Sequence, residues 1–287
     1  MGSIAVVSPI FTRYRLNRDS RIRVATMSLS ISKFAVATGL ATGTLLSCFG
    51  TSQAHATGFK FVGTYSQTSS STADILLESI TVGDQIIDEF SYVTSAEIIY
   101  NDVYSGGNTG AASADTGDDA TGGARAEDAT AADVVANLST NNINHIIDTE
   151  DKGRFEIDLN FSEAIKTLFV WERGMNSDLG IQAVNADGEL IGSRLDITRN
   201  MWFDTGFKID TSEINNAQKV GSLGIKMADL GVEGGEVSTL RFFSQSGFNG
   251  PDWKFVGTTA KVPEPALMLG LGLVGGALAW QKRAKAA

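Results

Sequence analysis

The sequence predicts an all-β chain, an antiparallel, jelly-roll-like β-sandwich between an N-terminal signal peptide and a short C-terminal transmembrane helix. Three observations support this. Many short segments have the composition and alternation of strands, Gly, Asn and Asp separate them, and helical patterns are rare. The two ends are apolar and cationic, whereas the middle is acidic. These features together predict one exported domain with a targeting segment at each end.

The strands follow from hydrophobic periodicity. Segment 154–161 alternates apolar and polar residues, as expected of a strand with one buried face, and 168–171 is a fully apolar, buried strand. Segments 179–184 and 189–197 flank Asn185-Ala186-Asp187-Gly188, a tight-turn sequence that predicts a hairpin. The other predicted strands share short length and β-forming composition: 75–82, 85–93, 97–104, 202–209, 222–227 and 236–244. Helical patterns occur only at 130–139 and 211–218.

A short internal similarity bears on topology. Phe59-Lys60-Phe61-Val62-Gly63-Thr64 recurs nearly unchanged as Trp253-Lys254-Phe255-Val256-Gly257-Thr258. The match is too short for a repeat architecture. It suggests first and last strands in similar places, with mutual pairing as one hypothesis and coincidence as the other.

Residues 1–56 have the organisation of a signal peptide. Lys33 precedes the hydrophobic stretch 34–49, and Ala54-His55-Ala56 has the small-x-small form of a signal peptidase site, which predicts cleavage after Ala56. Residues 1–26 are either a longer cationic region or a mis-assigned extension, so the start is Met1 or Met27. Cys48, the only cysteine, offers lipidation as an alternative.

Residues 263–287 combine three unlike features in order. Pro263-Glu264-Pro265 precedes the apolar run 266–280, and Lys282-Arg283 follows it. A helix over those 15 apolar residues would extend about 22 Å, which is short for a permanent anchor. The cations place the end of the run on the cytoplasmic side.

This tail resembles the PEP-CTERM sorting signal of exosortase substrates. The residues that carry the resemblance are Pro263, Glu264, Pro265, Gly270, Gly272, Lys282 and Arg283. It implies transient anchoring in the inner membrane, processing by an exosortase in addition to signal peptidase, and delivery to the cell surface or the extracellular space. An ordinary single-pass tail anchor is the alternative. Trp171-Glu172-Arg173-Gly174 and Asp187-Gly188 are also similar to a cyanobacterial group of exosortase-dependent surface proteins.

Removing both ends leaves the body, residues 57–262. It contains 14 Lys and Arg against 31 Asp and Glu, so its net charge is 14 − 31 = −17, compared with −10 for the whole chain. The net negative charge of this body would repel the phosphate groups of nucleic acid, so general electrostatic attraction will not bind it to nucleic acid. Its charge suits solubility outside the cell or binding of divalent cations.

The segment 105–133 is built from Gly, Ala, Ser, Thr and acids, which predicts a mobile loop. It contains Asp115, Asp118, Asp119, Glu127 and Asp128, and carboxylates of this kind can bind calcium. Their spacing matches no calcium-binding loop, so a solvated loop is the preferred interpretation.

Catalytic motifs are missing from the body, which holds a single histidine, His145, interpreted as structural. The predicted ligand loop follows the buried strand 168–171 and contains Glu172, Arg173, Asn176 and Asp178, which could hold calcium or sugar hydroxyls. A local Glu172–Arg173 ion pair is the simpler explanation. Five aromatic residues could stack on sugars but are more often core residues: Trp202, Trp253, Tyr92, Tyr100 and Tyr104.

Together these features predict a non-enzymatic surface or extracellular-matrix protein associated with exopolysaccharide, without a cofactor. The first alternative is a calcium-assisted carbohydrate-binding module. The second is a secreted glycan hydrolase that uses an acid pair.

Overall fold

The computed structural model describes residues 58–67, 70–105, 112–213 and 216–263, all within one compact unit, Thr51–Ala287. The strands are β1 (Val62–Gln67), β2 (Ile75–Val82), β3 (Gln85–Ile87), β4 (Val93–Asn101), β5 (Ala112–Thr116), β6 (His145–Thr149), β7 (Phe155–Ile165), β8 (Thr167–Arg173), β9 (Leu179–Val184), β10 (Leu190–Ile197), β11 (Phe203–Ile209), β12 (Gln218–Lys226), β13 (Val237–Ser244) and β14 (Asp252–Thr258). The helices are α1 (Ala131–Leu138), η1 (Met227–Leu230) and η2 (Glu233–Gly235). The predicted all-β class with antiparallel sheets is confirmed.

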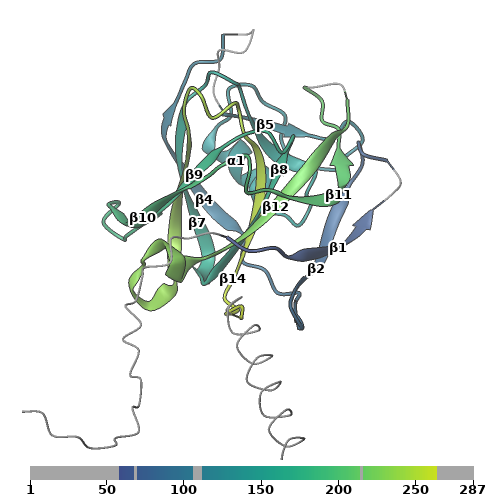
Figure 1. The fold of residues 1–287 in the computed structure, drawn as a ribbon. Helices are drawn as coiled ribbons and strands as arrows, with labels where there is room; N and C mark the ends of the chain where they lie inside the picture. The colour runs from purple at the N-terminus through teal and green to yellow at the C-terminus, as the bar shows by residue number, and fades with distance from the viewer. Residues whose placement is uncertain (1–57, 68–69, 106–111, 214–215, 264–287) are drawn as a thin grey trace, which may run out of the picture. The chain divides into compact units, whose positions relative to one another are not determined.

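Two large sheets face each other across the main core (Figure 1). One has the strand order β10-β9-β13-β7-β4, and the other has the order β11-β12-β8-β14-β6-β5. Every second residue of a strand faces the core, so Phe242 of β13 meets Trp253 and Phe255 of β14. The ring centroids of Phe242 and Trp253 are 4.8 Å apart, and those of Phe242 and Phe255 are 4.6 Å apart.

A small third sheet, β1-β2-β3, covers part of the outer face of the six-stranded sheet. Phe169 and Trp171 point outward from β8 into a second buried cluster with Phe59 and Phe61, whereas Leu168 and Val170 point into the main core. Strand β8 is therefore buried on both faces, as its continuous apolar sequence predicts.

Helix α1 packs against β4, β5 and β6, and thus covers the open side between the two large sheets. Its start is a capping box. The Thr130 hydroxyl accepts from the Asp133 backbone N–H, and the Asp133 carboxylate accepts from the Thr130 backbone N–H. Val134 and Leu138, one turn apart, enter the main core.

Most predicted elements are present. The 179–184 and 189–197 segments form the β9–β10 hairpin, and Asn185 Oδ1 accepts from the backbone N–H groups of Asp187 and Glu189 in its turn. The predicted strand 85–93 is shorter, because β3 ends at Ile87 and β4 begins at Val93. The predicted helix 211–218 is wrong: residues 211–213 form a bend, and β12 begins at Gln218.

Two further expectations need correction. Segment 105–133 is not one loop, because Ala112–Thr116 form the buried strand β5, paired with β6, and Asn137 of α1 donates to the Asp115 carbonyl. Backbone pairing and burial of alanines order a segment whose composition suggests mobility. The hypothesis that 59–64 pairs with 253–258 is also wrong, since Phe59 bridges Gly224 and β14 pairs with β8 and β6.

Several predictions lie outside the described residues. These are the signal peptide with its Ala54 and Ala56 site, and the sorting signal from Glu264 onward; Pro263 is described and exposed. No helix within the described ranges is long and apolar enough to cross a membrane.

Candidate functional site

A row of charged residues crosses the outer face of the six-stranded sheet. Strand alternation builds it: Trp253 and Ile147 face the main core, so their neighbours Asp252 and Asp148 face outward. The pairing of the strands places these residues side by side. Arg173 of β8 is opposite Asp252 of β14. Trp253 of β14 is opposite Ile147 of the antiparallel strand β6, so the next residues, Asp252 and Asp148, are also neighbours. Buried backbone pairing therefore assembles residues that lie far apart in the chain.

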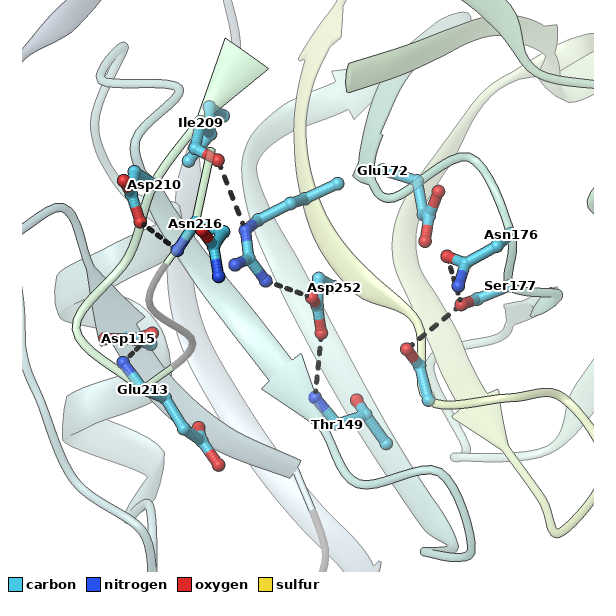
Figure 2. A network of polar contacts seen from close by, with 12 residues as sticks. Asp115, Thr149, Glu172, Asn176, Ser177, Ile209, Asp210, Glu213, Asn216 and Asp252 are labelled. Carbon is cyan, nitrogen blue, oxygen red and sulfur yellow. Dashed lines mark hydrogen bonds and ion pairs between the residues drawn. The ribbon is translucent and has the colours of Figure 1, made fainter. Parts of the chain in front are cut away.

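Arg173 and Asp252 form a buried ion pair, with the guanidinium Nη1 2.8 Å from Asp252 Oδ2. Arg173 Nε also donates to the Ile209 carbonyl at 3.4 Å, and Asp252 Oδ1 accepts from the Thr149 N–H at 3.4 Å (Figure 2). Burial raises the pKa of Asp252 to about 7, although Arg173 opposes this shift. The one positive charge of Arg173 is thus matched to Asp252.

Asp148 is 4% exposed and lies next to Asp252. Burial, together with the carboxylates of Asp252 and Asp115, raises the pKa of Asp148 well above its usual range. Asp148 Oδ2 is buried without a hydrogen-bond partner among the described residues.

Asp115 and Glu213 complete the acidic group. Asp115 Oδ1 accepts from the Thr116 N–H at 2.7 Å, and Asp115 Oδ2 accepts from the Glu213 N–H at 3.2 Å, which ties the segment after β11 to β5 (Figure 2). Asp115, Asp148 and Glu213 each offer a carboxylate oxygen, and these oxygens lie within 4.8 Å of one another. We call these three residues the acidic triad.

Two members of the triad, Asp148 and Glu213, line an open cleft of about 690 Å³. Its lining is almost entirely polar: Tyr104, Asp148, Thr149, Glu150, Asp151, Asn176, Glu213, Gln218, Asn249, Gly250 and Asp252. Burial raises the pKa of Glu213 to about 8, and the nearby carboxylates, first that of Asp148, add to the shift. Carboxylates at such close range repel one another, and either protonation or a bound cation reduces this repulsion.

The predicted ligand loop does not form one site. Strand alternation sends Arg173 to the acidic row and Glu172 to the opposite face, so the proposed local pair between them is absent. Glu172 Oε2 accepts from the Met175 N–H at 2.6 Å, and burial raises the pKa of Glu172 to about 8. Asp178 binds Arg199, with Nε to Oδ1 at 3.1 Å. Of the four predicted residues, Asn176 lines the cleft and Arg173 contacts its edge through Asp252.

The acids of segment 105–133 do not gather into one site, although Glu127 stays close to Asp115. Asp115 joins the triad, whereas Asp119 accepts from the Thr72 hydroxyl. Among the five aromatic candidates Tyr104 lines the cleft, and Trp202 and Trp253 are core residues. His145 is buried, with ring nitrogens hydrogen-bonded to Thr140 and Asn142, and burial lowers the pKa of His145 to about 4. A structural role for His145 accords with these contacts.

Sequence analysis missed Asp148, Glu213 and Asp252. One signal was available: charged residues alternate with large aromatic residues in Asp252-Trp253-Lys254-Phe255. A charge repeated on one face of a strand whose other face is core indicates a polar site over that face. Comparison of the chain with protein-family models, curated proteins and solved structures found no match.

Proposed function

We propose that this chain is an exported, non-enzymatic surface or extracellular-matrix protein, processed at both ends and associated with exopolysaccharide. Its body would be a jelly-roll-like sandwich, released from or held at the cell surface after transient anchoring in the inner membrane. The proposal rests chiefly on the order of features in the two ends. An all-β body with a net charge of −17 is consistent with a life outside the cytoplasm.

The limits of the folded body support this proposal. Phe59, three residues after the predicted cleavage point, is buried against Gly224 and Phe169. At the other end, Val262 is buried and Pro263 is exposed. The described packed residues thus begin shortly after one predicted processing point and end beside the other, which supports processing that leaves the buried strands intact.

Intact mass of the protein recovered from the cell exterior tests this directly. We expect a species that starts near Thr57 and ends between Pro263 and Pro265. Recovery of the full-length chain from the cytosol, with no envelope association, would contradict the proposal.

A second candidate function, carbohydrate binding, is favoured by the cleft. Its volume lies within the usual range for small-molecule sites, and its amides and carboxylates suit sugar hydroxyl groups. Asn176, Gln218 and Asn249 supply both donors and acceptors, and Tyr104 supplies an aromatic ring at the rim.

Binding of the purified full-length chain to the producing cell's exopolysaccharide tests this second function. We expect Gln218→Ala, in the cleft, to weaken retention on immobilised polysaccharide. Gln85→Ala removes a similarly half-buried amide outside the cleft and should leave retention unchanged. Equal retention of both variants would rule out the cleft as the glycan site.

The hydrolase alternative has a candidate acid in Glu213, whose raised pKa would suit proton donation. A glycosidase needs two carboxyl groups that reach opposite sides of one bond. The neighbours of Glu213, Asp115 and Asp148, are only 3% and 4% exposed, which is a poor arrangement for that chemistry. We therefore expect no release of reducing sugar. Release that Glu213→Gln abolishes would make the protein a hydrolase.

A further inference from the structure

We propose that Asp115, Asp148 and Glu213 bind one divalent cation of the calcium class at the base of the cleft. This inference deepens the proposed glycan-binding function by adding a cation to the same cleft. The cation site itself depends on the protein's own carboxylates, so it can be tested without any glycan.

The first observation is convergence. Asp115 comes from β5, Asp148 from β6 and Glu213 from the segment after β11, and their oxygens lie within 4.8 Å of one another. Backbone N–H groups hold Asp115 in place, and the Ser113 hydroxyl lies 3.5 Å from Glu213 Oε2. Two oxygens that each lie about 2.4 Å from one calcium ion can be at most about 4.8 Å apart, so the triad is compatible with a shared ion.

The second observation is independent of the first. The side chain of Asp148, 4% exposed, points into the triad, and its Oδ2 is buried with no hydrogen-bond partner among the described residues. A buried carboxylate oxygen without a donor is costly, and native structures seldom leave one. A cation at the triad would satisfy this atom.

Charge leads to the same conclusion. Asp115, Asp148, Glu213 and Asp252 carry four negative charges when ionised, and Arg173, which pairs with Asp252, carries one positive charge. The remainder is 4 − 1 = 3 negative charges. Glu127 and Glu150 lie close enough to repel Glu213 further. Arg125 directs its guanidinium to the Thr116 hydroxyl and to the carbonyls of Gly117 and Asp118.

The donor set selects the kind of cation. Carboxylate oxygens suit hard ions such as calcium or magnesium, and the triad contains no histidine or cysteine, the ligands typical of zinc. Calcium accepts irregular geometry and more ligands than three, and the open cleft gives water or sugar hydroxyls access to the remaining positions. Magnesium would require a near-ideal octahedron, so calcium should bind more tightly.

Titration calorimetry of the full-length chain in detergent and 150 mM KCl, freed of metals by a chelator, tests the proposal with calcium chloride alone. We expect one site per chain. Asp148→Asn and Glu213→Gln should each weaken calcium at least about tenfold. Asp88→Asn and Glu163→Gln are matched controls that remove the same charge from exposed positions, and they should bind as the parent does.

Thermal unfolding of the same proteins is a second measurement of calcium binding, which can still decide the question if one variant folds poorly. Calcium should raise the unfolding temperature of the parent and of both controls but not that of Asp148→Asn, an isosteric change whose own fold is checked by near-ultraviolet circular dichroism. Equal weak binding in all five proteins, or no binding by the parent, would overturn the cation site. Calcium binding without any exopolysaccharide binding would support the site and refute only the glycan function.

Discussion

The two faces of the six-stranded sheet differ in what they do. On the inner face, Trp253 and Phe255 stack against Phe242 in a closely packed aromatic core. On the outer face, the neighbouring residues Asp252 and Lys254 are charged and equally buried. Apolar burial stabilises a fold, whereas buried charges seldom stabilise it more than apolar residues would. The comparison suggests that the inner face maintains the fold, whereas the part of the outer face around Asp252, beside the apolar cluster of Phe169 and Trp171, maintains a site.

The largest loss of stability should follow from a substitution on the inner face. Trp253→Ala removes an aromatic ring that stacks on Phe242 and Phe255, so we expect the free energy of unfolding to fall by about 3–5 kcal/mol. Urea denaturation followed by circular dichroism measures this. Phe203→Ala, at a position 39% exposed, is the control and should have a much smaller effect. Similar losses for both would contradict the assignment of the core.

Disruption of the buried Arg173–Asp252 ion pair should cause the second-largest loss of stability. Arg173→Met leaves Asp252 buried beside Asp148 without a cation, and we expect a loss of about 3 kcal/mol in unfolding free energy. The double variant Arg173→Met with Asp252→Asn removes both charges and should recover at least half of that loss. A double variant as unstable as the single one would mean that Arg173 stabilises the fold by packing instead.

The buried carboxyl group of Glu172, on the inner face, should make the unfolding free energy depend on pH. Its folded pKa is about 8, raised by burial from the ordinary 4.5, so the unfolded chain releases this proton more readily. Stability from this group is therefore present below pH 4.5 and is lost as pH rises toward 8. We expect the unfolding free energy of Glu172→Gln to match that of the parent near pH 4.5 and to exceed it at pH 8. Parallel pH profiles of unfolding free energy would refute the shift.

An exposed ion pair should give the smallest effect. Lys219 Nζ lies 2.8 Å from Asp204 Oδ2, the same distance as in the Arg173–Asp252 pair, but both partners are exposed to water. Solvent screens such a pair, so we expect Asp204→Asn to leave the urea midpoint within experimental error. A loss comparable to that of Arg173→Met would show that burial is not what separates the two pairs.

Local sequence patterns predict much of the fold, and long-range pairing accounts for what they miss. Alternation in 154–161 and the turn Asn185–Gly188 predict β7 and the β9–β10 hairpin because the relevant contacts are close in sequence. Strand β5 has almost no apolar signal, and its order comes from pairing with β6, about 30 residues later. The acidic row was unpredictable as a unit, because register across four strands brings together Asp115, Asp148, Arg173 and Asp252.

At Arg173, local sequence predicts the end of a strand but not the partner of the ion pair. The sequence around this residue predicts a ligand site at a strand end, but its ion-pair partner Asp252 lies 79 residues away. The assumed partner Glu172 lies on the other face, because adjacent residues of a strand alternate.

Diffraction from crystals of the protein grown with calcium, with anomalous differences measured at a long wavelength, tests the central claim most directly. We expect a single strong peak bonded to Asp115, Asp148 and Glu213, with Asp148 Oδ2 among its ligands. A triad without such a peak, in crystals that show calcium elsewhere on this acidic surface, would contradict the assignment of the outer face as a cation site.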